Sequence, residues 1–217
     1  MEKSDAVRSM IHEMIQKADL SIPEEEKGKY EEIFVKIFCE NQKPRDVLGF
    51  SSEMMEHIYA YGYRLFNLGN YKQASDVFTS LTVYDPYEPR YTLALGAAFH
   101  RQKNLREASQ NYLRAGFMNP ADPVPFFYLY DVYQSSGIVG DAQFCLEEAI
   151  RRMGDNPVFS KMKEKSLLYL ESLKKEIEEL KSRGELEEIK PEIDVEDLPT
   201  EYQQMIAEEG KVKEIKQ

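Results

Sequence analysis

The chain has 217 residues, of which 42% are hydrophobic and 31% are charged, and this is enough for one folded domain with its own core. Its 39 acidic and 28 basic side chains give a formal net charge of -11 at pH 7. Because such a charge is repelled by phosphate backbones and anionic lipid surfaces, we expect neither nucleic acid nor a membrane as a direct ligand.

Two amphipathic helices are predicted in the amino-terminal part of the chain, after the helix-start residues Ser4 and Pro23. Apolar residues recur at helical spacing, first at Val7, Met10, Ile11, Met14 and Ile15, and then at Ile33, Phe34, Ile37 and Phe38. We expect these helices to cover the front of the fold, so that residues 1–50 form a helical cap and linker.

The most informative feature of the sequence is its self-similarity at a period of 34 residues. A shift of that length superposes Gly62 on Gly96, Ala74 on Ala108 and Ala142, Phe78 on Tyr112 and Leu146, and Pro86 on Pro120. This period and these residue types are those of the tetratricopeptide repeat (TPR), a pair of helices. The sequence therefore predicts an all-α fold, a three-repeat TPR α-solenoid, with repeats at 55–88, 89–122 and 123–156.

Glycine and proline have a separate physical reason at each repeat position. Gly62 and Gly96 lie in the middle of helices, where glycine costs about 1 kcal/mol relative to alanine, so a neighbouring helix is expected to approach closely there. Gly69 is suited to the left-handed conformation that ends a helix. Pro86 and Pro120 end the second helices because proline lacks the amide donor that a helix needs.

After the third repeat, an apolar stripe predicts a capping helix, with a short coiled coil as the alternative. The stripe consists of Leu167, Leu170, Leu173, Ile177 and Leu180. The three repeats and this helix together make up residues 51–180. Residues 181–217 are rich in Asp and Glu, and we expect them to form a solvated, flexible tail.

A row of aromatic residues on the first helix of repeat one is the best candidate for a binding surface. Tyr59, Tyr63 and Phe66 are four and three residues apart and therefore share one side of a helix. In the TPR geometry this side lines a concave groove, to which the later repeats would contribute Leu93, Ala97, His100 and Phe127. Aromatic side chains give large contact areas at low entropy cost, so we expect a cradle for an extended peptide. The alternative is that the three rings are core residues packed against the amino-terminal helices.

The sequence resembles the class II type III secretion chaperones, the SycD/LcrH family, which protects pore-forming translocator proteins in the bacterial cytoplasm. The resemblance covers about residues 35–180, and it rests on Ser51 to Tyr61, Gly69 to Tyr71, Leu81 to Tyr87, Leu95 to Ala98 and Tyr169-Leu170. The chain departs from the family pattern in its longer amino-terminal part and its acidic carboxyl tail.

The resemblance implies a function in binding and not in catalysis. The groove would hold an extended amino-terminal segment of a translocator, with a Pro-x-Leu-x-x-Pro type motif, and keep that protein soluble and competent for secretion. Tyr59, Tyr63 and Phe66 match the aromatic positions that receive the apolar side chains of the motif. Tyr112 also matches a family aromatic, although it coincides with a TPR core position. The resemblance further implies a homodimer through the amino-terminal helices, in a mode that the sequence leaves open.

Two other classes of TPR protein are alternatives to a translocator chaperone. A TPR clamp for the carboxylate of heat-shock proteins needs lysine, asparagine and arginine in the groove, but the corresponding positions are Tyr59, Tyr63, Ala97, Val124 and Tyr128. A TPR scaffold or regulatory adaptor without chaperone activity remains open as the alternative function.

No pattern of an enzyme, a metal site or an exported protein is found. His12-Glu13 begins a zinc-protease motif, but Gln16 replaces its second histidine, and no phosphate-binding glycine loop occurs. Cys39 and Cys145 are far apart and without a Cys/His cluster, which favours two buried thiols. The first twenty residues mix charged with apolar residues, unlike a secretory signal. We therefore expect a cytoplasmic protein with no catalytic residues, cofactor or metal.

Overall fold

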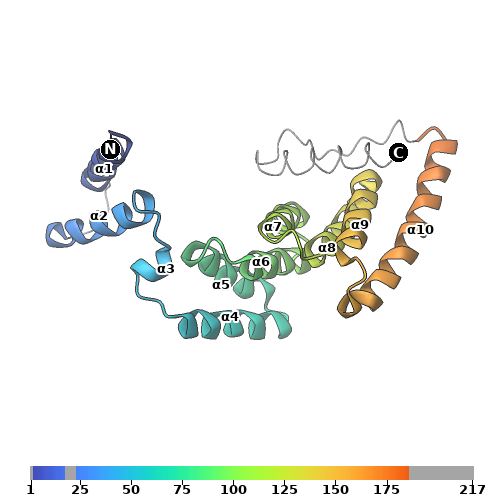
Figure 1. Ribbon diagram of the computed structural model, residues 1–217, viewed down its shortest axis with the longest axis horizontal. Helices are drawn as coiled ribbons and strands as arrows, with labels where there is room; N and C mark the ends of the chain where they lie inside the picture. Colours follow the sequence, from blue (N-terminus) through green and yellow to red (C-terminus); the bar gives the residue numbers. More distant parts are fainter. Residues whose placement is uncertain (1, 18–22, 186–217) are drawn as a thin grey trace. The chain divides into compact units, whose positions relative to one another are not determined.

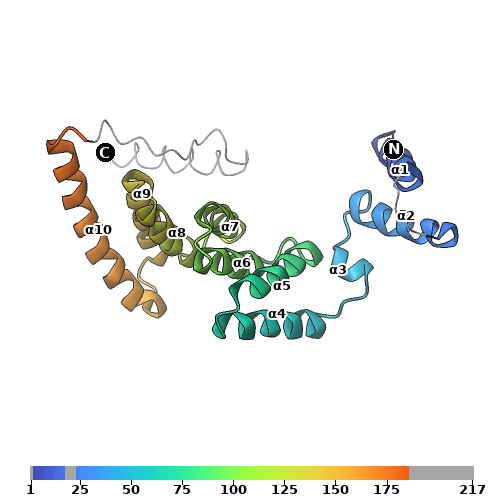
Figure 2. The same cartoon turned by 180° about the vertical axis from the view of Figure 1, so that it is seen from behind.

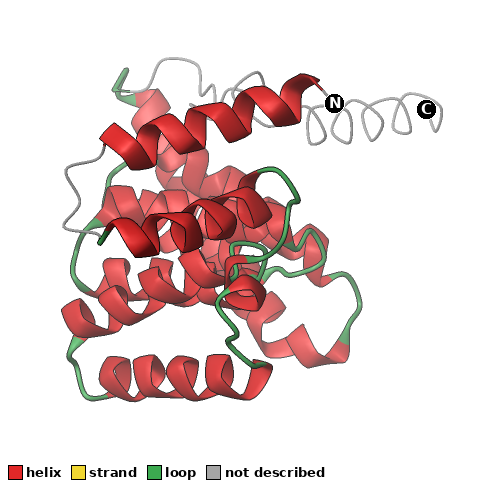
Figure 3. Cartoon of the chain, turned by 90° about the vertical axis from the view of Figure 1, so that its left-hand side faces the viewer, coloured by secondary structure: helices red, strands yellow, loops and turns green. Residues whose placement is uncertain are grey.

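The computed structural model describes residues 2–17 and 23–185, and the regular secondary structure of these residues is entirely helical (Figure 3), as predicted. None of the helices described in these ranges has the length and apolar character needed to span a bilayer. The chain divides into two compact units, Met1–Tyr91 and Thr92–Gln217, which are taken in turn. The acidic tail after residue 185, predicted to be solvated, lies outside the described residues.

The first unit begins with a pair of helices that pack on each other. It contains α1 (Glu2–Lys17), α2 (Glu24–Phe38), α3 (Pro44–Val47), α4 (Ser52–Asn67) and α5 (Tyr71–Tyr84) (Figure 1). Ile11 and Ile15 of α1 are buried against Val35 of α2. The predicted apolar face of α2 is only partly buried, since Phe34 is 37% and Phe38 is 66% exposed. The buried face of α2 is therefore centred on Val35 and not on these two rings.

The short helix α3 is joined to the end of α5 by charged side chains. Asp85, which caps α5, is 3% exposed, and its carboxylate lies 3.2 Å from Lys43 Nζ and 3.3 Å from Arg45 Nη1. A buried carboxylate is tolerated when cations pair with it. Next to this cluster, Phe50 packs edge-on against Tyr84 with ring centroids 4.7 Å apart.

Helices α4 and α5 form the first predicted helix pair, and local sequence sets its ends. The hydroxyl oxygen of Ser51 accepts a hydrogen bond from the Met54 amide, 3.1 Å away, and so caps the start of α4. Gly69 follows α4 in the left-handed conformation, with φ +81°. In the middle of the pair, a Cβ on Gly62 would lie 2.7 Å from Cε1 of Phe78, so the close approach predicted from the glycine is confirmed.

The second unit holds the remaining helices. They are α6 (Pro89–Arg101), which begins at the end of the first unit, α7 (Leu105–Met118), α8 (Val124–Ser135), α9 (Val139–Met153), a 3-10 turn (Pro157–Phe159) and α10 (Ser160–Ser182). Helix α8 packs against both α7 and α9, and α10 packs along α9, as the views from opposite sides show (Figure 1; Figure 2).

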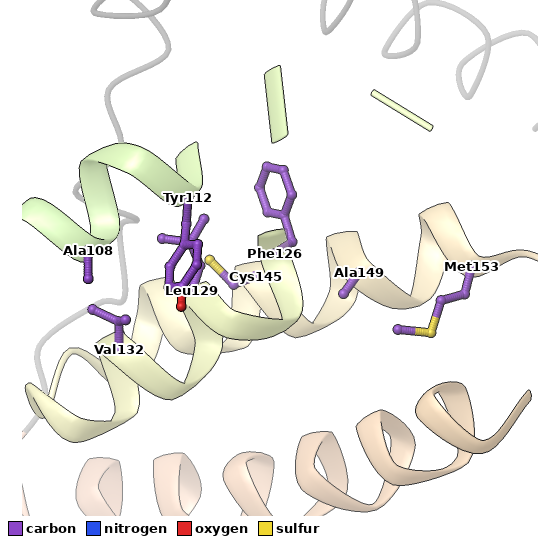
Figure 4. Close-up of a cluster of buried hydrophobic side chains, with 8 residues drawn as sticks. All are labelled: Ala108, Tyr112, Phe126, Leu129, Val132, Cys145, Ala149 and Met153. Atoms are coloured by element: carbon purple, nitrogen blue, oxygen red, sulfur yellow. The ribbon is translucent and has the colours of Figure 1, made fainter. Parts of the chain in front are cut away.

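The core of the second unit is formed by side chains of α7, α8 and α9, and Tyr112 extends from α7 toward α8 (Figure 4). The cluster consists of Ala108, Tyr112, Phe126, Leu129, Val132, Cys145, Ala149 and Met153. Gly96 of α6 makes room for this tyrosine, since a Cβ there would lie 2.8 Å from Tyr112 Cδ1. In α10, Leu173 and Ile177 are buried against α9, whereas Leu167 is 49% exposed, so only part of the predicted apolar stripe caps the repeats.

Adding a methyl group should have opposite effects at a crowded helical glycine, Gly62, and at an uncrowded one, Gly28. We expect Gly62→Ala to lower the free energy of unfolding by about 1 kcal/mol, because the overpacking cost of about 1–3 kcal/mol exceeds the gain of about 1 kcal/mol in helix propensity. The matched control is Gly28→Ala in α2, where a Cβ would meet no atom within 4 Å. This variant should be neutral or slightly more stable. Urea denaturation measures both, and a stabilised Gly62→Ala protein would contradict the close packing.

Candidate functional site

The three aromatic residues predicted for repeat one lie together along α4. The ring centroids of Tyr59 and Tyr63 are 6.0 Å apart, and those of Tyr63 and Phe66 are 6.2 Å apart. Tyr63 is 50% exposed, whereas Tyr59 and Phe66 are half-buried. Phe66 packs edge-on against Tyr71 of α5, with ring centroids 5.3 Å apart. The three rings therefore form a row along α4, as the sequence spacing predicted, and Tyr63 is the most exposed of them.

An open hollow of about 630 Å³ lies beside this row. It is lined by Tyr59, Ala60, Tyr63, Arg64, Asn67 and Leu68. Tyr59 also contacts the rings of Phe78 and Tyr91, at centroid distances of 5.8 and 5.5 Å. The Tyr59 ring is thus held by contacts with these two rings and also lines the hollow. Two of the three predicted rings are therefore side by side with free volume and are not sealed inside the unit.

Next to the row, the guanidinium of Arg90 is paired with two carboxylates. The guanidinium of Arg90 lies 5.6 Å from the centroid of the Tyr59 ring, and it donates hydrogen bonds to Glu56, at 2.7 Å, and Glu88, at 3.0 Å. These bonds raise the pKa of Arg90 above its ordinary value, and the bond to Arg90 lowers the pKa of Glu56. The positive charge of Arg90 is therefore fully engaged by Glu56 and Glu88, and the three side chains together carry a net charge of -1. Residues 56 and 90 are one repeat length apart, and this spacing is the sequence signal for the pair.

In the second unit, most of the predicted groove residues are partly buried. Leu93, Ala97 and Phe127 are half-buried and pack against the core cluster. Tyr112 is 1% exposed and belongs to that core, consistent with its TPR core position. It contributes to the surface only through its neighbours, since the Tyr128 ring stacks on it with centroids 5.5 Å apart.

His100 connects Tyr112 with an exposed carboxylate. Its Nδ1 lies 3.5 Å from the Tyr112 hydroxyl oxygen, and its Nε2 lies 3.5 Å from Oδ2 of Asp131. Burial lowers the pKa of His100, and the Asp131 charge opposes this shift. Burial also raises the pKa of Tyr112. At neutral pH the imidazole is therefore uncharged and offers one donor and one acceptor to its neighbours.

The aromatic surface of the second unit extends onto α10, which the sequence did not predict. We define the ring strip as Phe127, Tyr128, Tyr130 and Tyr169. Lys165 Nζ lies 5.7 Å from the centroid of Phe127 and 5.2 Å from that of Tyr169. Tyr169 in turn stacks on Tyr130 of α8, with centroids 5.4 Å apart. The four-residue spacing of Lys165 and Tyr169 places both on one face of α10, but nothing in the sequence says that this face meets α8.

The arrangement favours binding over chemistry. Among the residues that the structure describes, no three His, Cys, Asp or Glu side chains are grouped so that they could hold a metal ion. Cys145 is buried, and burial raises the pKa of its thiol well above the ordinary value, so it is not a nucleophile. Cys39 is only partly buried, in contrast to the sequence prediction of two buried thiols. Each unit by itself offers half-exposed rings, on α4 in the first unit and on α8 and α10 in the second, and such rings suit the apolar side chains of an extended chain.

Comparisons with known proteins agree with this geometry. The tetratricopeptide repeat family matches residues 55–88. The chaperone protein SicA of Salmonella typhimurium is 31% identical over 130 residues, which cover 60% of this chain and 76% of SicA. The Yersinia enterocolitica type III secretion chaperone SycD, solved in complex with a peptide of the translocator YopD, is similar with a TM-score of 0.57 and 25% identity over 58% of this chain and 96% of SycD. An alternative dimer of SycD has a TM-score of 0.57 and 26% identity, over 59% of this chain and 97% of that one. The predicted all-α TPR fold is confirmed.

Removing the charge of Asp131 tests the environment of His100. Because the carboxylate stabilises the imidazolium form, we expect Asp131→Asn to lower the pKa of His100 further, so that the ring stays neutral to a lower pH. NMR titration of the imidazole protons measures this pKa. Asp155→Asn is the control, since its fully exposed carboxylate pairs with Lys163 and does not act on His100. A pKa of His100 that is unchanged in Asp131→Asn would show that the two side chains do not interact.

Proposed function

Because the chain belongs to the class II type III secretion chaperones of translocator proteins, we propose that it binds an extended segment of a hydrophobic translocator and keeps that protein soluble and competent for secretion. The observation that carries this proposal is the row of rings on α4 beside an open hollow. The solved complex of the relative SycD with a translocator peptide supports an extended peptide as the ligand. The bound segment is of the Pro-x-Leu-x-x-Pro type.

The chemistry of the α4 surface suits such a segment. Tyr59 is fixed by its contacts with Phe78 and Tyr91, so little side-chain entropy is lost when a ligand packs on it. Tyr63 is the more exposed ring and has the most surface to lose to a ligand. A proline-bearing segment is already close to extended, which lowers the entropy cost on the ligand side. Apolar side chains of the translocator would contact Tyr59, Tyr63 and Phe66.

In the second unit, considered by itself, the predicted groove residues would also contact a translocator segment. Leu93 and Ala97 supply apolar contacts, Phe127 supplies a ring, and His100 supplies hydrogen bonds. Tyr112 supports the site from the core through Tyr128 and does not itself contact the ligand. The repeats and capping helix, residues 51–180, would thus hold the translocator segment, and no residue is assigned a catalytic role.

In this proposal, residues 1–50 serve self-association and do not bind the translocator segment. Phe34 and Phe38 of α2 stack with centroids 6.0 Å apart and expose apolar surface, which suits self-association as a homodimer. The relative SycD forms an alternative dimer. The place of action is the bacterial cytoplasm, where a translocator waits before secretion.

The test of the binding site replaces the two rings that line the hollow. We expect Tyr59→Ala combined with Tyr63→Ala to weaken binding of a fluorescently labelled translocator segment at least tenfold, which corresponds to about 1.4 kcal/mol and is typical of ring contacts at the centre of an interface. Fluorescence anisotropy measures the affinity, and circular dichroism checks that helicity is retained.

Tyr61→Ala is the matched control, because Tyr61 is on the same helix, is 56% exposed and does not line the hollow. Its affinity should equal that of the unchanged protein. If the double variant folds and still binds the segment as tightly as the Tyr61→Ala protein, the α4 site is refuted.

A further inference from the structure

Helices α8 and α10 face each other along the ring strip, and their contacts follow the same order in both helices. Phe127 of α8 meets Lys165 of α10, whose Nζ lies 5.7 Å from the ring centroid. Further along both helices, Tyr130 stacks on Tyr169 with centroids 5.4 Å apart. The two helices therefore run in parallel here, and the strip has a Phe127 end and a Tyr130 end.

The cation at the Phe127 end has its charge available for a ligand. Lys165 is exposed, and its Nζ also lies 5.2 Å from the centroid of Tyr169. Three other lysines of α10 pair with carboxylates of the second unit, namely Lys163, Lys174 and Lys175. Among the side chains that the structure describes, no carboxylate pairs with Lys165. Because two rings already restrict this side chain, pairing with a ligand carboxylate costs less side-chain entropy than at an ordinary exposed lysine.

Two carboxylates lie at the Tyr130 end of the strip. Asp131 follows Tyr130 in α8, and Glu176 of α10 accepts a hydrogen bond from Gln134 Nε2 at 3.2 Å. The partners of both carboxylates are neutral, since Asp131 lies 3.5 Å from the uncharged imidazole of His100. Burial raises the pKa of Tyr130, and the charges of Asp131 and Glu176 raise it further. A ligand carboxylate is therefore repelled at this end of the strip and attracted at the other.

The rings at the Phe127 end set the spacing that a ligand must match. Tyr128 is 39% exposed, and its ring centroid is 5.9 Å from that of Phe127, over which Lys165 lies. In an extended chain, side chains two residues apart are on the same side and about 7 Å from each other. One such side chain can thus pack on Tyr128 while the next one on that side reaches the Lys165 ammonium. The residue between them points to the opposite side and makes neither contact.

We propose that the Phe127 end of the ring strip selects translocator segments in which an acidic residue stands two positions from an apolar one. The apolar side chain packs on Tyr128, and the carboxylate pairs with the ammonium of Lys165. This pattern belongs to a part of the translocator other than the Pro-x-Leu-x-x-Pro segment assigned to α4. The inference rests on the proposed function for the identity of the ligand, but the preference itself can be measured with synthetic peptides.

The first experiment compares two synthetic peptides of equal composition, each added to the full chain. In Ser-Leu-Ser-Leu-Ser-Glu-Ser the acid is on the same side as both leucines, whereas in Ser-Leu-Ser-Leu-Glu-Ser-Ser it is on the opposite side. We expect the first peptide to bind about threefold more tightly, which is within the range of an exposed ion pair. NMR titration measures both dissociation constants from the chemical-shift changes of the strip residues.

The second experiment assigns this preference to Lys165. Lys165→Gln should bind the two peptides equally, and Lys165→Glu should instead prefer a peptide with lysine in place of the glutamate, because the charges are then complementary again. Lys161→Gln is the matched control, since Lys161 is an exposed lysine one turn earlier on α10 for which the described residues show no ring contact. This control should keep the preference of the unchanged protein.

The outcomes separate this inference from the proposed function. A preference for the first peptide that is lost in Lys165→Gln and kept in Lys161→Gln supports selection by the strip. Equal affinities in the unchanged protein, no binding of either peptide, or a preference that survives Lys165→Gln overturns it. If no form of the protein binds a translocator segment, the proposed function fails, and the peptide titration still decides whether the strip selects this spacing of charge.

Discussion

The fold depends on a repeated contact in which the backbone of a glycine receives the face or edge of an aromatic ring. Gly62 receives Phe78, Gly96 receives Tyr112, and Gly116 receives Phe126, and a Cβ at each glycine would lie 2.6–2.8 Å from the ring. Each contact lets two helices approach more closely than any side chain would permit, and each uses a buried ring as the wedge. The same ring then serves as the base on which exposed rings rest, as Tyr59 does on Phe78 and Tyr128 on Tyr112.

The two units use similar rings in different electrostatic settings. On α4 the cation above Tyr59 is bound by Glu56 and Glu88. On α10 the ammonium of Lys165 lies over two rings and retains its charge for a ligand. The two units therefore differ in the electrostatic surroundings of their rings.

The sequence predicted those features that are encoded by local spacing. The 34-residue period predicted the helix pairs, Gly69 marked the end of α4, and the mid-helix position of Gly62 implied the close approach of a neighbouring helix. The Tyr59, Tyr63 and Phe66 row followed from helical geometry. Features that depend on partners distant in the chain were missed, because periodicity carries no information about them.

The missed features share this cause. The pairing of Asp85 with Lys43 and Arg45 joins residues about forty positions apart. The contact of Tyr130 with Tyr169 depends on how α10 returns across α9. The helical spacing of Phe34 and Phe38 equally suits a buried and an exposed face, and the choice between them is made by Val35, which alone of these three residues is buried against α1.

In the first unit, the ion pairs of Asp85 with Lys43 and Arg45 are a contact between α3 and the end of α5 that depends on charge. A short helix held mainly by two charged side chains is released at a lower free-energy cost than one held by a large apolar interface, and added salt weakens that hold. The pair α1 and α2 has its own small core of Ile11, Ile15 and Val35, which does not include this ionic contact. The attachment of α3 to the repeats is therefore sensitive to ionic strength, whereas the apolar cores on either side of it are not.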